Sequence, residues 1–380
     1  MALYGKQVMP SLKNIFRRLF SVRGNQAGPE TVIDDLQSPR HPESLPSPFE
    51  NLSLPGGAAP NAKPIGGRAA KPDPAIPAKQ FSEVVAEVIE AANATAAAES
   101  GDAANLPQLD EMELMDSVEQ VWTPTRIELV QKIWGPGFCR PGGTDFTIQQ
   151  VKNFSPLTEG MNFMDANAGL GGALMAVAES FPLAIQGMEA NEAIFRQGRA
   201  LLAKAGKQVI PMRFANPEEL EMPKEALDCI YARDLLVGVG GKARLLQQFC
   251  QGLRERGQML LVDLMMPDEV DPKPVRRWLA QQSISSVPWT ASHFEKSIRS
   301  NPDMECRAQD DITDAYIEQI VNGWRAYLQT LLVARPSKKF LQIVLKEVVY
   351  WAELVELMQS GKLRYMRLYA RRKPQAETKA

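Results

Sequence analysis

Apolar and polar residues follow two alternating periods over the middle of the chain. Short apolar runs typical of strands span 161–165, 183–189, 208–214, 227–232 and 258–264. Between these runs, apolar side chains recur at helical spacing over 172–181, 191–205 and 242–254. Strands and helices that alternate in this way form right-handed crossovers, so the pattern predicts an α/β fold with a doubly wound, mostly parallel sheet.

A helix is predicted just before the first of these strands. Thr123 and Pro124 form a typical start, with a capping hydroxyl followed by proline at the first helical position. Ile127, Val130 and Trp134 follow at helical spacing, and Gly135 ends the pattern. An acidic helix is expected to precede this one, beginning near residue 109.

The first 107 residues differ from the rest of the chain in amino-acid composition. They contain 13 of the 28 prolines, and the segment 38–79 consists largely of Pro, Gly, Ala and Ser. Such a composition cannot bury enough apolar surface to offset the entropy lost on ordering. We therefore predict that residues 1–107 form a largely disordered tail and that residues 108–380 form the folded domain.

Two amphipathic helices are predicted within this tail, near 11–22 and 81–92. The first is flanked by basic residues, and no acidic residue comes before Glu30, so residues 11–23 could make peripheral contact with an anionic membrane surface. Docking on the chain's own domain or on a partner protein is the alternative. The second helix has acidic flanks and could pair with the first.

Composition excludes several classes of protein. Of the 380 residues, 23% are charged, and 43 Lys and Arg nearly balance 45 Asp and Glu, so the chain is not a globally basic nucleic-acid binder. The four cysteines form no C-x-x-C pair, which argues against a zinc finger or a disulfide framework. No run of 18 apolar residues and no export signal is evident. We expect a cytoplasmic protein, at most peripheral at the inner face of a membrane.

The segment 163–172 carries the most specific chemical signal. Its strand ends in Asp165, and a turn containing Gly169 and Gly171 leads into a helix. Glycines allow a ligand to approach the backbone closely, and the helix N-terminus offers free N–H groups. A cofactor is therefore expected at this strand end. A dinucleotide fingerprint would place a small residue at 174, where this chain has Leu174, which favours the other common cofactor of such sheets, S-adenosylmethionine.

The order D-x-x-x-G-x-G-G from Asp165 to Gly172 resembles the first motif of class I S-adenosylmethionine-dependent methyltransferases. Later strand ends follow the same family order, with an acid after the second strand for the ribose hydroxyls and an amide after the third, near the adenine. The resemblance implies that the cofactor is held by Asp165, Asn167, Gly169, Gly171, Glu189, Ala190, Asn216 and Arg233.

The resemblance extends over roughly residues 121–372. Segments 310–313 and 361–372 are similar to the family's last two strands, which implies a seven-stranded sheet of Rossmann-like methyltransferase type. Helical lid insertions are expected near 267–300 and 312–360. The loop 134–143 is similar to one in phosphoethanolamine and related small-molecule methyltransferases.

The chain departs from the family pattern at two positions. Asn167 stands where the first motif usually has glycine, and asparagine is among the few residues that tolerate left-handed backbone. Gly238 stands where the phosphoethanolamine enzymes have a histidine, so that histidine's role does not carry over.

Few residues are candidates for catalysis. Methyl transfer from a sulfonium is an in-line displacement that needs no metal, and none is predicted here. A hydroxyl acceptor would need a general base, for which Asp234, just after the fourth strand, and His293, at a helix start, are the weak candidates. Capping or cofactor orientation explains Asp234 equally well, and His293 could simply be exposed.

Aromatic residues recur at helical spacing over 316–331 and 340–354. Such stripes usually belong to the core, but a pocket lined by them would accept an apolar acceptor or a cation. The leading hypothesis is methyl transfer to a small-molecule or lipid-like acceptor, without nucleic acid as a partner. The alternative is a non-catalytic scaffold or regulator with the same fold, and a nicotinamide oxidoreductase is the third possibility.

Overall fold

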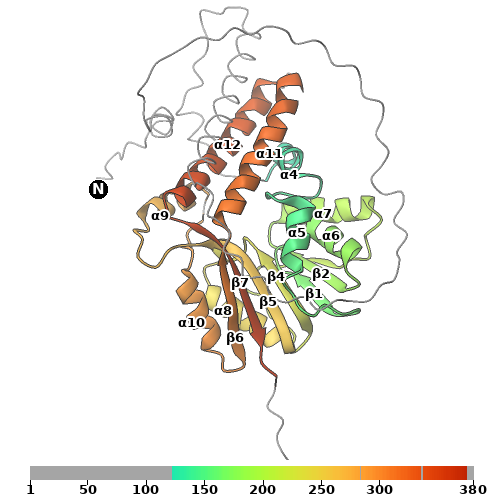
Figure 1. Ribbon diagram of the computed structural model, residues 1–380. Helices are drawn as coiled ribbons and strands as arrows, with labels where there is room; N and C mark the ends of the chain where they lie inside the picture. Colours follow the sequence, from blue (N-terminus) through green and yellow to red (C-terminus); the bar gives the residue numbers. More distant parts are fainter. Residues whose placement is uncertain (1–121, 283, 335–336, 375–380) are drawn as a thin grey trace, which may run out of the picture. The chain divides into compact units, whose positions relative to one another are not determined.

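The computed structural model describes residues 122–282, 284–334 and 337–374 (Figure 1). The predicted tail over 1–107, its helices near 11–22 and 81–92, and the acidic helix near 109 lie outside the described residues. Within the described part, no helix is both long and apolar enough to cross a membrane.

A seven-stranded sheet with the order β3-β2-β1-β4-β5-β7-β6 forms the centre of the domain. β7 runs antiparallel to both of its neighbours, β5 and β6, whereas all the pairings among the strands β1 to β5 are parallel. The predicted seven-stranded, mostly parallel sheet is therefore confirmed. The strands are β1 Asn162–Asp165, β2 Ala184–Glu189, β3 Met212–Phe214, β4 Leu227–Arg233, β5 Leu253–Met265, β6 Met304–Asp311 and β7 Arg364–Arg372.

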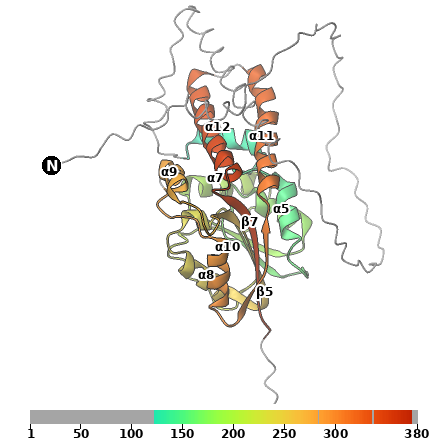
Figure 2. The same cartoon turned by 60° about the vertical axis from the view of Figure 1, so that its left-hand side comes forward.

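Helices flank the sheet on both sides (Figure 2). α6 (Gly172–Ser180) and α7 (Glu192–Lys204) contact β2, and α5 (Gly143–Val151) packs on α6. On the other side, α8 (Lys242–Gly252) contacts β5, and α10 (Ala291–Arg299) packs on α8 and β6. Buried apolar side chains from β1, β4, β5 and β7 meet those of α8 and α10 in the main core, which holds the strand ends in fixed positions.

α11 (Thr313–Ala334) and α12 (Lys338–Gln359) connect β6 to β7. Because β6 points the same way as β1 to β5, the two helices project from the edge where the parallel strands end (Figure 1). α4 (Pro124–Trp134) contacts both of them. Its start is as predicted, since the Thr123 hydroxyl accepts a hydrogen bond from the backbone N–H of Arg126 at 3.2 Å.

Tryptophan side chains pack α4 against α11 and α12. The ring of Trp134 lies edge-on to Trp324 at 6.4 Å and to Trp351 at 4.9 Å between centroids. Gly323 makes the approach possible, because a Cβ there would fall 2.4 Å from the Trp134 ring. α4, α11 and α12 therefore form one packed unit at the carboxyl edge of the sheet. α9 (Lys273–Gln281), which follows β5, packs against α12.

Candidate active site

Two glycines in left-handed backbone shape the turn after β1. Gly169 has φ 58° and Gly171, which precedes α6, has φ 84°. A side chain at Gly169 would lie 3.1 Å from the sulfur of Cys139, so the 135–143 loop approaches this turn closely. The carbonyl oxygen of Gly137 in this loop also accepts a hydrogen bond from the backbone N–H of Gly172, at 2.9 Å.

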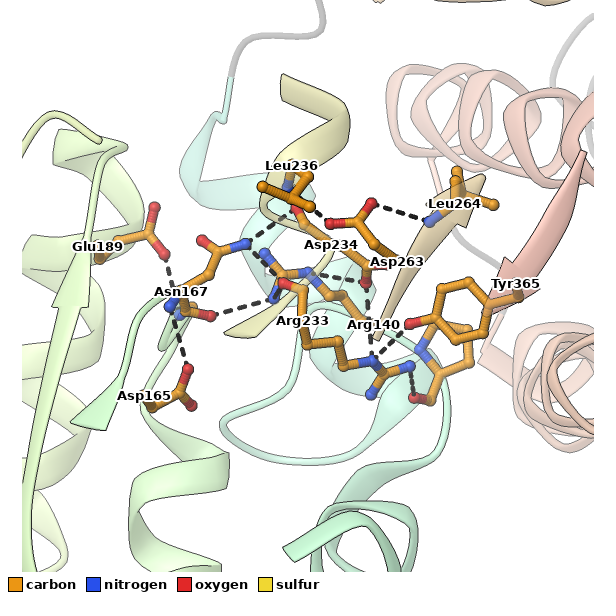
Figure 3. A network of polar contacts seen from close by, with 12 residues as sticks. Arg140, Asp165, Asn167, Glu189, Arg233, Asp234, Leu236, Asp263, Leu264 and Tyr365 are labelled. Carbon is orange, nitrogen blue, oxygen red and sulfur yellow. Dashed lines mark hydrogen bonds and ion pairs between the residues drawn. The ribbon is translucent and has the colours of Figure 1, made fainter. Parts of the chain in front are cut away.

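Asn167 does not need left-handed backbone, because the positive φ angles of this turn belong to Gly169 and Gly171. Its side-chain amide instead donates to the carbonyl oxygen of Arg233 at 2.8 Å and to that of Asp234 at 3.1 Å (Figure 3). The departure from glycine thus has a structural role that the sequence did not reveal. Asn167 links the turn after β1 to the end of β4.

Asp165 is 2% exposed and ends β1 beside the turn. Its carboxylate accepts a hydrogen bond from the backbone N–H of Asn167 at 3.1 Å. Burial raises the pKa of Asp165 to about 6, although this hydrogen bond and the charge of Arg140 lower it. A cation bound close by would favour the ionised carboxylate.

Glu189 holds two neighbouring turns together. One oxygen accepts from the backbone N–H of Gly169 at 2.9 Å and the other from that of Asn191 at 2.8 Å. The acid is 5% exposed and comes from the end of β2, next to β1 in the sheet. The predicted meeting of Asp165, the glycine turn and Glu189 at one edge is what the structure shows.

Arg140 lies at the centre of the polar network (Figure 3). One of its terminal nitrogens, Nη1, donates to the carbonyl oxygens of Asn167 and Arg233, both at 3.1 Å. Its Nε lies 3.4 Å from Oδ2 of Asp234. The guanidinium therefore occupies two backbone acceptors and one carboxylate where β1 and β4 end.

Arg233 is 5% exposed and joins three parts of the fold. Its Nε donates to the hydroxyl of Tyr365 on β7 at 2.9 Å, and its Nη2 donates to the carbonyl oxygen of Pro141 at 2.7 Å. The guanidinium also lies 4.4 Å from the ring centroid of Phe146. This side chain fixes the 135–143 loop to β4 and β7, and Arg233 also contributes to the wall of a small cavity at the glycine turn.

Asp234 and Asp263 form an acidic pair next to the arginines. Asp234 has φ 51°, a left-handed conformation that aspartate tolerates better than most residues. Asp263 accepts from the backbone N–H groups of Leu236 at 2.6 Å and Leu264 at 2.8 Å. Burial and the charge of Asp234 raise the pKa of Asp263 to about 7.

Two cavities open onto this network. A small one of about 30 Å³ lies at the glycine turn, with Asp165, Asn167 and Tyr231 in its wall. A larger one of about 290 Å³ extends from Glu189 across Asp234 to α9 and α12. Cys139 and Arg140 line both, so these two residues form the partition between them.

Several predicted site residues lie outside both cavities. Ala190 and Asn216 are exposed, and the Asn216 side chain accepts from the backbone N–H of Glu218 at 3.1 Å. His293 is exposed at the start of α10, where its backbone N–H donates to the Thr290 hydroxyl at 3.1 Å. Gly238 is also exposed, and a side chain there would meet no atom within 4 Å. Of the two catalytic candidates, only Asp234 lines a cavity.

The structure also brings in residues that the sequence did not single out. Asp263 could have been found by the strand-end rule that selected Asp165 and Glu189. Arg140 comes from a loop, and its contacts depend on how that loop folds back. The cavity wall supplied by helices adds Arg126, Trp278, Glu347 and Tyr350, and it also contains Tyr316 and Trp351 from the two aromatic stripes that the sequence pattern indicated. Within the described residues, no three His, Cys, Asp or Glu side chains are grouped to hold a metal ion.

Known proteins resemble this chain in sequence and in fold. No protein-family model matches the sequence. Phosphoethanolamine N-methyltransferase 3 of Arabidopsis thaliana is 26% identical over 135 residues, which are 35% of this chain and 27% of that protein. The chain thus spans about a quarter of this relative's length.

Solved structures share the fold at low identity. Phosphoethanolamine N-methyltransferase 2 of Haemonchus contortus, in complex with S-adenosyl-L-methionine, has a TM-score of 0.59 at 18% identity, covering 69% of this chain and 60% of that one. Geranyl diphosphate C-methyltransferase of Streptomyces coelicolor A3(2) has a TM-score of 0.52 at 13% identity, covering 70% and 100%. The chain therefore has the fold of the class I S-adenosylmethionine-dependent methyltransferases and is similar in sequence to those of the phosphoethanolamine type.

Proposed function

We propose that this protein transfers a methyl group from S-adenosylmethionine to a small-molecule acceptor. The observation that carries the proposal is the convergence of Asp165, the Gly169–Gly171 turn and Glu189 at one sheet edge, beside a cavity of about 290 Å³. Relatives named as methyltransferases, and a neighbour of the same fold crystallised with S-adenosylmethionine, support it.

The polar groups at this edge suit the cofactor. Its ammonium needs acceptors: the carboxylate of Asp165 is one, and the carbonyl oxygens of Asn167 and Arg233 are others for which it would compete with Arg140. Its ribose hydroxyls fit the carboxylate of Glu189. The hydroxyl of Tyr231 is buried, has no hydrogen-bond partner among the described residues, and belongs to a side chain in the small cavity wall. When bound, the cofactor supplies a methyl group on a sulfonium. The chain's own residues would orient it and exclude water.

Calorimetric titration with S-adenosylmethionine and S-adenosylhomocysteine tests the proposal. We expect micromolar binding by the parent and at least tenfold weaker binding by Asp165→Asn and Glu189→Gln. Glu219→Gln, an exposed carboxylate away from the site, is the matched control and should bind like the parent. A folded parent that binds neither ligand would contradict the proposal.

A non-catalytic scaffold with this fold is the second candidate, and one observation favours it. Cys139 and Arg140 separate the glycine turn from the larger cavity, and small-molecule pockets usually measure about 300–1,000 Å³. A cofactor that binds without being consumed on any acceptor would support this alternative. A cytoplasmic location and membrane contact through residues 11–23 stay predictions from the sequence.

A further inference from the structure

The far half of the larger cavity lies beyond Asp234, under the helices that project from the sheet edge. Trp122, α4, α9 and α12 supply most of its wall, while Leu264 comes from β5 and Val237 from the turn after β4. This half differs in chemistry from the end near Glu189, and its composition defines what the cavity can bind.

Aromatic rings dominate the wall. Trp278 and Tyr350 are stacked with centroids 5.5 Å apart, and Trp351 lies edge-on to Tyr350 at 5.0 Å. Trp122 and Tyr316 complete the aromatic set. The indole N–H of Trp278 is buried without a hydrogen-bond partner among the described residues. Such a wall favours a flat apolar group.

The charges of the wall disfavour an anionic ligand. Three carboxylates line the cavity, from Glu189, Asp234 and Glu347, against the guanidiniums of Arg126 and Arg140. Glu347 is 3% exposed and accepts from Nε of Arg126 at 2.9 Å. Because Nε of Arg140 also lies 3.4 Å from Oδ2 of Asp234, both cations of the wall are already paired with acids.

A phosphate monoester carries a charge of about −1.5 to −2 at pH 7 and would have to break these pairs while facing three carboxylates. An ammonium would instead find acidic groups and aromatic faces, both of which attract cations. The cavity volume of about 290 Å³ is just below the usual range for small-molecule sites, and the cofactor would take the end near Glu189, so the far half has room for one ring and not for a long acyl chain.

Building on the proposed function, we infer that the methyl acceptor is a small amine that carries an apolar ring, rather than a phosphate ester. The ring lies against Trp278 and Tyr350, and the nitrogen faces Asp234. In the transfer step, the bound ammonium first gives one proton to water. The lone pair of the resulting neutral amine forms the N–C bond, and the C–S bond breaks with its electron pair staying on sulfur, which leaves a methylated ammonium.

Calorimetry on the full chain tests this inference with three probes: 2-phenylethylamine, 2-phenylethanol and phosphoethanolamine. We expect the amine to bind at least tenfold more tightly than either of the others. Trp278→Ala should weaken amine binding at least tenfold, while Trp289→Ala, which removes an indole outside the cavity, should not. If Trp278→Ala does not fold, Asp234→Asn provides a second variant, in which the preference for amine over alcohol should be lost.

The inference would be overturned if phosphoethanolamine bound as tightly as 2-phenylethylamine or more tightly. It would also be overturned if the cavity variant that folds kept the parent's affinity for the amine. Titration of S-adenosylhomocysteine in the same samples separates it from the proposed function. If S-adenosylhomocysteine binds and the amine does not, only the acceptor class is wrong. If the amine binds and S-adenosylhomocysteine does not, methyl transfer is wrong, and with it the role of the amine as acceptor.

Discussion

Nη1 of Arg140 donates a hydrogen bond to the carbonyl oxygen of Asn167 at 3.1 Å, and the same nitrogen donates to the carbonyl oxygen of Arg233. A cofactor ammonium at the glycine turn would use the same two acceptors. We therefore expect Arg140→Ala to bind S-adenosylhomocysteine at least about tenfold more tightly than the parent, because a charge-assisted hydrogen bond worth about 1.5–3 kcal/mol no longer competes. Calorimetry measures the difference.

Arg244→Ala provides the matched control. This arginine is exposed on α8 and donates to the carbonyl oxygen of Glu218 at 2.7 Å, away from both cavities. Its removal should leave cofactor affinity unchanged. Weaker binding by Arg140→Ala would show that the guanidinium holds the cofactor instead of competing with it.

Binding of the cationic cofactor should depend on the ionisation of Asp165. Because burial raises the pKa of this carboxyl to about 6, it is mostly neutral at pH 5 and mostly ionised at pH 7. We expect affinity for S-adenosylmethionine to rise by about tenfold between these pH values, as expected for a single carboxyl that must lose its proton. Calorimetry at the two pH values measures it, and Asp165→Asn should flatten the dependence. An equal rise in that variant would assign the effect to another group.

Stability should also depend on pH, through Asp263. Its folded-state pKa of about 7 exceeds the ordinary carboxyl value, so the folded chain binds this proton more tightly than the unfolded chain. The stabilisation is complete below about pH 4 and is lost as the pH rises through about 7. Urea denaturation should show a lower free energy of unfolding at pH 8 than at pH 6. Asp234→Asn removes the repulsion between the acids and should reduce that difference.

The link between Asn167 and the end of β4 should contribute to stability. Asn167→Ala removes two hydrogen bonds without forcing a new backbone conformation, and we expect a loss of about 1–2 kcal/mol in the free energy of unfolding. Asn167→Gly, which restores the usual residue of the motif, should lose at least as much. Asn153→Ala, at the exposed end of α5, is the comparison for removal of an amide side chain. Equal losses at the two positions would contradict the role of Asn167.

The buried contact between Arg233 and Tyr365 offers a matched pair of tyrosine variants. Tyr365→Phe removes the acceptor of an ionised donor, so we expect a loss of about 1.5–3 kcal/mol. Tyr316 stacks on Tyr365 at 3.7 Å between centroids, and Tyr316→Phe keeps this stacking. Urea denaturation should therefore show a much smaller change for Tyr316→Phe. A similar change in both variants would mean that ring packing, not the hydrogen bond, dominates.

The sheet and its acidic strand ends were predictable because each depends on a local pattern. β1, β2 and β4 end within one residue of their predicted limits, and α4 has the predicted cap. The strand predicted over 208–214 is observed only as Met212–Phe214, since Pro211 has no N–H for the ladder. β5 begins at Leu253 instead of 258, and its pairing with β4 shifts register between Leu227 and Cys229. The residues between the predicted helix and the predicted strand thus belong to β5, which is irregular there.

The remaining parts of the site depend on tertiary packing. Arg140 and Cys139 form the partition only because the 135–143 loop folds over the glycine turn. The aromatic periodicity of α11 and α12 predicted buried faces, yet of the residues in these two stripes only Tyr316, Trp351 and Leu354 line the cavity. Spacing along a helix cannot distinguish a residue that faces a cavity from one that faces another helix.

α11 and α12 cover the end of the cavity that is proposed to take the acceptor. They leave the sheet at the end of β6 and rejoin it at the start of β7, and these two points are adjacent. The backbone N–H of Ile312 donates to the carbonyl oxygen of Tyr365 at 2.9 Å, and Nε of Arg364 lies 3.5 Å from Oδ2 of Asp311. An insertion whose two ends meet in this way can be exchanged as a cassette without changing the course of the sheet. Recombination or directed evolution at this junction could therefore diversify the acceptor range, while Asp165, Glu189 and the glycine turn stay under separate selection.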